Sequence, residues 1–261
     1  MKNKFRSKLF GFFNLINPVV FKGLLYVFKK INEFKNKPRI LIFTDSRGFE
    51  VTKPWNRKNP YSSYIGSLLT RFSCTVSICE HKHTSILDFI EYYDKIKNKE
   101  FDLVVLHCGI VDFAPRPESS FDEMYESKRN IINKLHLDDY IKKKNRKAGV
   151  KYNGEDTYSF LSAESLQSIV FSRLSKIENL VYIGINPILL DWDGNYWRKR
   201  PSNINDQLVL DELVCKQLKL KLCLSQLTRS EIIKYTSDNV HYTKVGFNFI
   251  SQKLEQFLPE V

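Results

Sequence analysis

The sequence is poor in the residues on which repetitive, disulfide-linked or metal-stapled proteins depend. Ten glycines and nine prolines among 261 residues exclude a collagen-like or low-complexity chain. The cysteines are Cys74, Cys79, Cys108, Cys215 and Cys223. Their number is odd, no Cys-x-x-Cys pair occurs, and the histidines do not accompany them at ligand spacing. We therefore expect free thiols in a reducing compartment, with no metal and no cofactor.

Acidic residues are almost absent from the first 39 residues. This stretch holds ten Lys and Arg but one acid, Glu33, and so contributes +9 of the net charge of +12. Residues 40–261 hold 31 basic and 28 acidic residues and are nearly balanced. Because the excess charge is confined to one end, a general nucleic-acid surface is not favoured, and we expect no nucleic-acid partner. Apolar residues make up 43 % of the chain, which is enough for a full hydrophobic core.

The basic N-terminal segment carries an apolar pattern with helical spacing. Its apolar residues are Phe5, Leu9, Phe12, Phe13, Ile16, Val20, Leu24, Val27, Phe28 and Ile31. Asn17-Pro18 predicts a break or a restart in this helix. No small-x-small cleavage site ends the run, which argues against a signal peptide. Polar residues interrupt the run before it reaches the ~20 apolar residues of a membrane span.

Lysines flank this segment on both sides, which suits retention on the cytoplasmic side of a membrane. We interpret residues 1–37 as a basic amphipathic helical segment that lies among the headgroups on the inner face of the membrane. The alternative is a helix that packs on its own domain or on a partner subunit. The remaining residues, 38–261, are expected to form one α/β domain. The sequence leaves the oligomeric state open.

Short apolar runs alternate with helical stretches from residue 39 onward. We expect strands at 39–43, 74–79, 101–107 and 179–185, and a weak strand at 231–235. Helices are expected at 60–72, 84–97, 203–224 and 243–258, and a long helix-prone region at 118–176. This alternation predicts a parallel sheet that is covered by helices on both faces. In such folds the active site lies beyond the carboxyl ends of the strands.

Three segments at that edge carry residues suited to nucleophilic catalysis. The first strand is followed by Thr44-Asp45-Ser46-Arg47-Gly48, the third by Cys108-Gly109-Ile110-Val111-Asp112, and the last helix is preceded by Asp238-Asn239-Val240-His241. A serine at a strand-to-helix turn can expose its hydroxyl near a helix N-terminus. A histidine can act as its base when a carboxylate holds the imidazole. Each segment alone is also compatible with helix caps and turns.

The order and spacing of these segments resemble the SGNH (GDSL-like) hydrolases and acyltransferases. The Gly-Asp-Ser block of that family corresponds to Thr44-Asp45-Ser46, Gly-x-Asn-Asp to Gly109-Ile110-Val111-Asp112, and Asp-x-x-His to Asp238 and His241. The resemblance implies a flavodoxin-like three-layer α/β/α sandwich. It also implies that Ser46 is the nucleophile, His241 the base and Asp238 its orienting partner. The segment 109–117 (GIVDFAPRP) further resembles SGNH-type proteins associated with bacterial surface-polysaccharide synthesis.

Two positions depart from the family pattern, and both concern the oxyanion hole. Val111 stands where the family has an amide-donating Asn, and residues 80–85 contain no glycine. Loss of one oxyanion donor typically lowers the rate about 10²–10³-fold. The residues that we consider as replacement donors or substrate contacts are Arg47, His83, Gly109, Asp112, Arg116 and Asn186.

These resemblances thus imply a serine esterase or O-acyltransferase that acts on a carbohydrate ester. The departure at Val111 leaves open a non-catalytic binding or assembly protein of a polysaccharide pathway. The N-terminal segment leaves open a membrane-docked lipid esterase. Trp192, Tyr196 and Trp197 follow the fourth strand and could stack on a sugar or pack locally. A basic loop at 142–151 is expected to be a solvated surface or a contact for an anionic polymer or headgroup.

Overall fold

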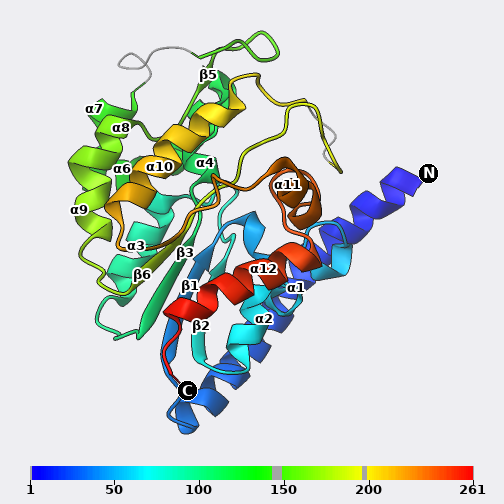
Figure 1. Cartoon of the computed structure of the whole chain (residues 1–261), viewed down its shortest axis with the longest axis vertical. Coiled ribbons are helices and arrows are strands. Elements are labelled where there is room, and N and C mark those ends of the chain that lie inside the picture. Colours follow the sequence, from blue (N-terminus) through cyan, green and yellow to red (C-terminus); the bar gives the residue numbers. More distant parts are fainter. Residues whose placement is uncertain (1, 143–148, 196–198, 261) are drawn as a thin grey trace.

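The computed structural model describes residues 2–142, 149–195 and 199–260, with side chains from residue 8 onward. Within these residues, five parallel strands form one sheet in the order β2-β1-β3-β6-β7. The strands are β1 (Arg39–Thr44), β2 (Ser73–Ile78), β3 (Leu103–His107), β6 (Leu180–Ile183) and β7 (Leu220–Leu222). This is the flavodoxin-like strand order 2-1-3-4-5. Figure 1 shows the sheet between two layers of helices, as the sequence predicts.

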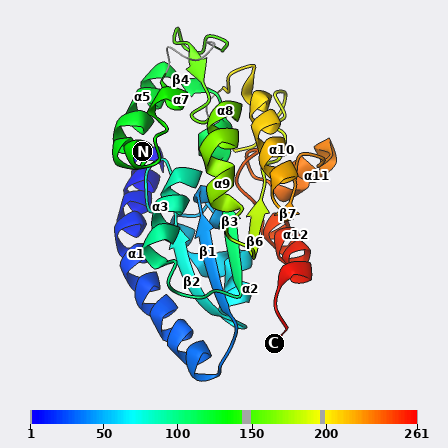
Figure 2. The ribbon, with the colours of Figure 1, turned by 90° about the vertical axis from the view of Figure 1, so that its left-hand side faces the viewer.

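The sheet has a helical layer on each face, because successive side chains of the buried strands point to opposite faces. Leu41 and Phe43 of β1 pack into the cluster on one face, and Ile40 and Ile42 pack into the cluster on the other. Helices on the first face include α3 (Ile86–Ile96), α5 (Glu118–Ser127), α6 (Arg129–Lys134), α7 (Asp138–Ile141), α8 (Ala163–Ser165), α9 (Phe171–Leu174) and α10 (Gln207–Gln217). The second face is covered by α2 (Tyr64–Leu69) and α12 (Lys244–Leu254). Figure 2 looks onto the sheet from the first face, so that the strands lie side by side in the order β2-β1-β3-β6-β7 behind α3 and α9.

Several elements differ from the sequence prediction. Residues 231–235, expected as a strand, belong to helix α11 (Arg229–Tyr235), because Thr228 and Glu231 form a capping box at its start. The expected helix at 203–224 ends at Gln217, and β7 follows it as a short, lysine-bearing edge strand. The helix-prone region at 118–176 is divided into α5–α9, with a π-helical turn at Leu166–Val170.

Shorter elements complete the architecture. The expected helix at 60–72 is a 3₁₀ turn, Pro60–Ser62, followed by α2. Helix α4 (Ile110–Phe113) follows β3, and the two-residue strands β4 (Arg116–Pro117) and β5 (Thr157–Tyr158) pair with each other. All five cysteines lie in the described part of the chain and are free; three are buried, Cys79 is partly buried and Cys223 is exposed.

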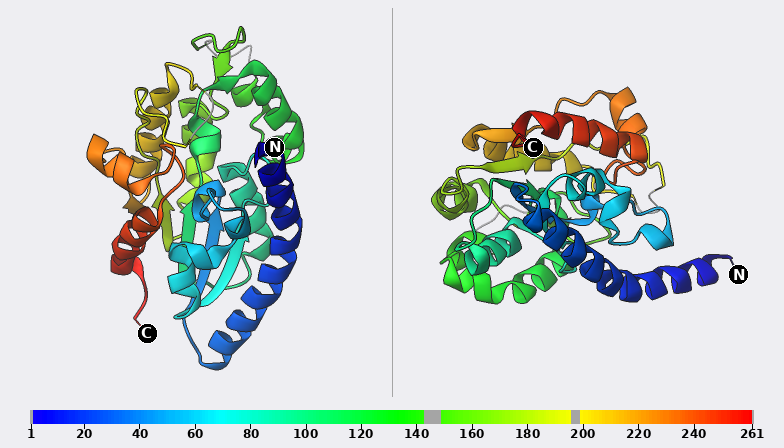
Figure 3. Two further views of the ribbon diagram at one scale, coloured as in Figure 1. Left: turned by 90° about the vertical axis from the view of Figure 1, so that its right-hand side faces the viewer. Right: turned by 90° about the horizontal axis from the view of Figure 1, so that it is seen from below.

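The N-terminal segment is one helix, α1 (Lys2–Phe34), which continues through Pro18. The predicted break at Asn17-Pro18 is therefore wrong. Pro18 has no backbone N–H, so one helical hydrogen bond is absent at this point. Contacts of the neighbouring side chain hold the helix to the domain instead, because the Asn17 amide donates to the carbonyls of Trp55 and Arg57 at 3.1 and 2.7 Å. Figure 3 shows α1 as a gently curved rod that runs along one side of the domain.

Helix α1 packs on its own domain beside the edge strand β2. The Asn32 amide is buried and donates to the carbonyls of Leu69 and Phe72, both at 2.8 Å. The Lys29 ammonium donates to Thr75 of β2 at 3.0 Å. Residues Lys8–Phe34 are also long and apolar enough to cross a membrane, by length and composition alone. The run that we expected to be too short for a span therefore meets that criterion.

Candidate active site

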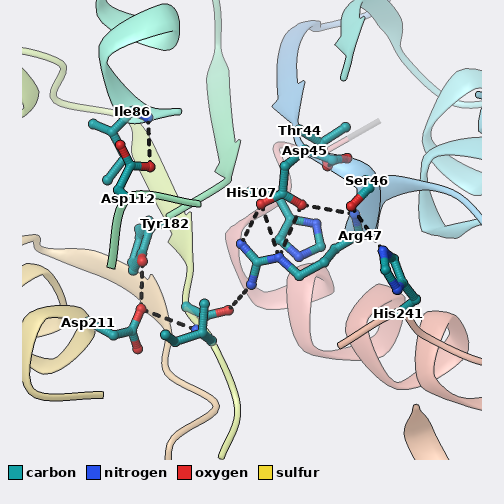
Figure 4. A network of polar contacts seen from close by, with 12 residues as sticks. Thr44, Asp45, Ser46, Arg47, Ile86, His107, Asp112, Tyr182, Asp211 and His241 are labelled. Atoms are coloured by element: carbon teal, nitrogen blue, oxygen red, sulfur yellow. Dashed lines mark hydrogen bonds and ion pairs between the residues drawn. The ribbon is translucent and has the colours of Figure 1, made fainter. Parts of the chain in front are cut away.

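Ser46 lies at the carboxyl end of β1, in the first position of the 3₁₀ turn Ser46–Gly48. Asp45 caps this turn by accepting from the backbone N–H of Arg47 at 2.9 Å. The Asp45 carboxylate also accepts from the Arg47 guanidinium, with a salt bridge of 3.0 Å. Both side chains are almost completely buried, and Figure 4 shows the pair beside Ser46.

The Arg47 guanidinium reaches across the sheet as well. It donates to the carbonyl of Gly184 at 2.9 Å, just beyond β6. Burial alone would lower the pKa of Arg47, but the charge of Asp45 outweighs it and raises this pKa. Arg47 is thus a structural cation that is bonded inside the protein. Arg47 does not line the cavity at Ser46, so the structure does not support the oxyanion role that we expected for it.

Ser46, His241 and Asp238 form a connected chain of hydrogen bonds. The Ser46 hydroxyl lies 3.0 Å from Nε2 of His241, and Nδ1 of His241 lies 2.8 Å from the Asp238 carboxylate. Figure 4 shows His241 facing Ser46 from the opposite side of the site. This geometry lets the imidazole accept a proton from the hydroxyl while the carboxylate fixes the ring.

The segment that carries Asp238 and His241 is held by backbone contacts. Asp238 accepts from the N–H groups of Val240 and His241 at 3.1 and 2.8 Å. Burial alone would raise the pKa of Asp238, but hydrogen bonds and charge from His241 lower it. Asp238 is therefore ionised at neutral pH, as an orienting carboxylate requires.

Asn186 and Asn239 complete that support. The Asn186 amide donates to the carbonyls of Pro187 and Asn239 at 2.9 and 2.8 Å, so it braces the segment and does not line the cavity. Asn239, with a positive φ of 69°, donates to the carbonyl of Trp192. Trp192 thereby helps to hold the segment before His241. Tyr196 and Trp197, and most of the basic loop (143–148), lie outside the described residues.

A cavity of about 260 Å³ opens beside Ser46 and His241. It includes Val111, whose side chain cannot donate a hydrogen bond, and Arg116, whose Nε donates to the Val111 carbonyl at 3.3 Å. The backbone N–H of Ser46 occupies the first position of its turn, where intrahelical partners are lacking. No bond from that N–H to another described residue is found.

The remaining expected contacts lie elsewhere. Gly109 has a φ of 127°, which favours glycine, and an added Cβ would lie 2.8 Å from the Tyr182 hydroxyl. His83 lies 3.5 Å from Glu123 in a separate hollow. Asp112 is buried and accepts from the backbone N–H of Ile86 at 3.0 Å. None of the three lines the cavity at Ser46, so the expectation that they contact substrate is not supported.

Residues that we did not predict line the same cavity. They include Tyr152, Lys199, Arg200, Ile204 and Gln207. Arg200 donates to the backbone carbonyl of Asp238 at 2.8 Å. The basic run around residue 200 carries a visible charge signal in the sequence. Gln207 carries none, because a single Gln at the start of a helix is common and neutral.

Neither models of known protein families nor curated protein sequences match this chain. Among solved structures, the acetyl xylan esterase AlAXEase aligns with a TM-score of 0.40 and 14 % identity, over 85 % of this chain and 100 % of that chain. The salicylyl-acyltransferase SsfX3 from a tetracycline biosynthetic pathway aligns with a TM-score of 0.38 and 14 % identity, over 84 % of this chain and 53 % of that chain. Likeness this distant does not transfer either activity to this chain.

The buried pair beneath Ser46 yields the first prediction. Arg47→Met leaves the Asp45 carboxylate buried without its cation, so we expect a loss of about 3–5 kcal/mol in the free energy of unfolding. Urea denaturation followed by circular dichroism measures it. Arg71→Met, which removes an exposed pair with Glu255, is the matched control and should cost less than about 1 kcal/mol. Equal losses in the two variants would contradict the structural role of Arg47.

Asp112 yields a prediction about pH. Burial raises its pKa from 3.8 to about 8, although the N–H of Ile86 and the charge of Lys128 oppose the shift. Between these two values the folded state retains a proton that the unfolded state has lost. The stabilisation is therefore full below the unfolded value, and stability falls as the pH rises toward about 8.

We expect Asp112→Asn to remove this contribution. Unfolding free energies at pH 5.5 and 8.5 should show the variant gaining stability relative to wild type as the pH rises, by at most about 1.4 kcal/mol per unit. Asp206→Asn, at an exposed carboxylate, is the control. A difference between wild type and Asp112→Asn that does not change with pH would refute the raised pKa.

Proposed function

We propose that this protein is an SGNH-type serine esterase or O-acyltransferase. The observation that carries the proposal is the chain of contacts from Ser46 to His241 at 3.0 Å and from His241 to Asp238 at 2.8 Å. Ser46 attacks the acyl carbonyl as His241 takes its proton, and ionised Asp238 stabilises the imidazolium. His241 then protonates the departing alcohol, which leaves an acyl-enzyme. Water or an acceptor hydroxyl attacks that intermediate and completes hydrolysis or transfer.

The oxyanion of this reaction would be stabilised by the backbone N–H of Ser46. Val111 supplies no second donor from its side chain, unlike the Asn of the resembled family. Because one missing donor costs about 10²–10³ in rate, we expect slow turnover of simple esters. The same absence motivates the competing reading of a non-catalytic binding protein, which the experiment below separates from an enzyme.

We propose a carbohydrate ester in surface-polysaccharide synthesis as the substrate. The sequence resemblance of GIVDFAPRP supports the polysaccharide context, and this segment forms α4 and one wall of the cavity. The cavity is lined by polar and charged side chains as well as apolar ones, and its volume is about 260 Å³. A mixed lining and this volume suit a sugar-sized group better than a lipid chain. These features favour a sugar ester over the lipid esterase alternative.

Labelling by a fluorophosphonate probe tests the nucleophile. Wild type should be labelled and should hydrolyse an activated acetyl ester, whereas Ser46→Ala and His241→Ala should lose about 10⁴-fold or more in kcat. Their thermal stability should change little, because both side chains face the cavity. Ser172→Ala, at an exposed serine of α9, is the matched control. Full activity of His241→Ala, or labelling that survives in Ser46→Ala, would rule out this mechanism.

We also propose that α1 docks on an anionic lipid surface at the cytoplasmic, inner face of the membrane. Asn17 and Asn32 bind the domain and Leu25 packs against its core, whereas other apolar side chains of α1 remain on the outer face. Large exposed residues of this outer face are Phe12, Leu15, Ile16, Val19, Val20, Leu24, Tyr26, Val27, Ile31 and Phe34. A surface of this kind on an otherwise folded domain calls for an apolar partner.

The charge of the segment selects an anionic bilayer as that partner. Lys8 and Lys22 are exposed on α1, and Lys30, Lys35 and the residues beyond them extend the basic character to its end. A helix with a basic border and an apolar stripe lies in the headgroup plane. Crossing the bilayer would instead detach α1 from the domain and leave the bonds of Asn17 and Asn32 unmade.

Vesicle sedimentation tests this proposal. Full-length protein should bind vesicles of phosphatidylglycerol and phosphatidylcholine, more at low than at high salt, since each nearby basic residue contributes about 1 kcal/mol. Val19→Asp, at a side chain that is 74 % exposed, should weaken binding about tenfold without unfolding the protein. Val209→Asp, at the 65 % exposed Val209 of α10, is the matched control.

Two results would count against membrane docking. One is full-length protein that ignores anionic vesicles at low salt, which would favour a partner subunit on this face. The other is equal vesicle binding by Val19→Asp and wild type.

A further inference from the structure

The cavity beside Ser46 is lined by positive charge. Arg116, Lys199 and Arg200 contribute side chains to its wall together with His241. No Asp or Glu is found among the described residues that line it. The body of the chain carries nearly equal numbers of basic and acidic residues, so this local excess does not follow from composition. Clefts lined by one sign of charge concentrate ligands of the opposite sign.

Two of these cations are held in place by backbone contacts. Arg116 lies between Pro115 and Pro117, and its Nε donates to the carbonyl of Val111 at 3.3 Å. Arg200 precedes Pro201 and donates from one terminal nitrogen to the carbonyl of Asp238 at 2.8 Å. Guanidinium groups carry five donors in a planar fork, which matches carboxylate and phosphate oxygens.

Gln207 adds an uncharged polar group to the same wall. It is the first residue of α10, its side chain is fully buried, and it lines the cavity. Within the described structure neither its amide nitrogen nor its amide oxygen has a hydrogen-bond partner. A buried amide without partners is destabilising, so its presence here calls for a ligand. Substrate in the cavity can supply both a donor and an acceptor.

We infer that the cavity binds an ester whose sugar-sized body carries a carboxylate or a phosphate. The cations bind the anionic group, and the Gln207 amide binds an uncharged hydroxyl or carbonyl of the same molecule. That the ligand is an ester rests on the proposed function, but the binding of its anionic group does not depend on catalysis. Its chemistry is common to an acidic sugar and to a sugar phosphate.

Binding to the catalytically silent Ser46→Ala protein tests the inference. Calorimetric titrations would compare glucose with glucuronate and with glucose 1-phosphate, at low and high salt. We expect at least one anion to bind about tenfold or more tightly than glucose, with the advantage reduced by salt. The two anion arms distinguish a carboxylate from a phosphate. Equal binding of all three compounds would overturn the inference.

Variants locate the binding to this cavity. Added to Ser46→Ala, Arg116→Gln or Arg200→Gln should each reduce the preference for the anion about tenfold. Arg39→Gln, at an exposed arginine at the opposite end of β1, is the matched control and should leave it unchanged. Anion binding that survives both cavity variants would place the anion elsewhere and contradict the inference.

Gln207→Leu separates a binding role from a structural one. Replacing an unpartnered buried amide by an apolar side chain should raise the melting temperature while it weakens ligand binding. A residue needed for packing would show lower stability with ligand affinity unchanged, and that result would remove Gln207 from the proposed site.

The proposed function and this inference can fail separately. Loss of fluorophosphonate labelling with intact anion binding would overturn the esterase and preserve the anion site. Labelling at Ser46 without any preference for anions would do the reverse.

Discussion

The buried ion pair between Asp45 and Arg47 is the constraint on which the site depends. Asp45 directly follows β1, caps the turn that carries Ser46 and binds the Arg47 guanidinium. That guanidinium also donates to the carbonyl of Gly184 beyond β6. The carboxyl ends of strands that are not adjacent are thereby tied together. Because isolated charges are costly in this interior, neither partner can move without the other. Ser46 is thus presented on a turn with little freedom.

The opposite half of the site is fixed mainly by hydrogen bonds to the backbone of the segment 237–241. The Asn186 amide donates to the carbonyl of Asn239 within this segment, and the Asn239 amide donates to the carbonyl of Trp192 outside it. One carboxylate oxygen of Asp238 accepts from N–H groups of its own turn, and the other contacts Nδ1 of His241. His241 is therefore held in the orientation that proton transfer from Ser46 requires.

The sequence was informative where local chemistry and periodicity agree. The central strands β1 and β3 are apolar except at their ends, and the placement of Ser46, Asp238 and His241 at one edge follows from parallel topology. It misled at 231–235, where Ile232 and Ile233 suggest a strand but Thr228 and Glu231 impose a helix. Gln207 could not be found from the sequence, because its role depends on which distant segments surround the cavity. The basic run at Arg200 carries a charge signal, but the sequence does not say that it lies beside Ser46.

Helix α1 leaves many apolar side chains exposed, although Leu25, Phe21 and Phe28 pack against the domain. The amides of Asn17 and Asn32 also face the domain, where they donate to the carbonyls of residues 55, 57, 69 and 72. The first two belong to the loop after β1, at the same edge of the sheet as Ser46. A bilayer that covers the outer face of α1 would therefore lie near the rim of the active site. An anionic bilayer would attract α1, but it would repel a membrane-linked substrate that carries its own negative charge. The cations of the cavity would offset this repulsion and hold such a substrate beside Ser46.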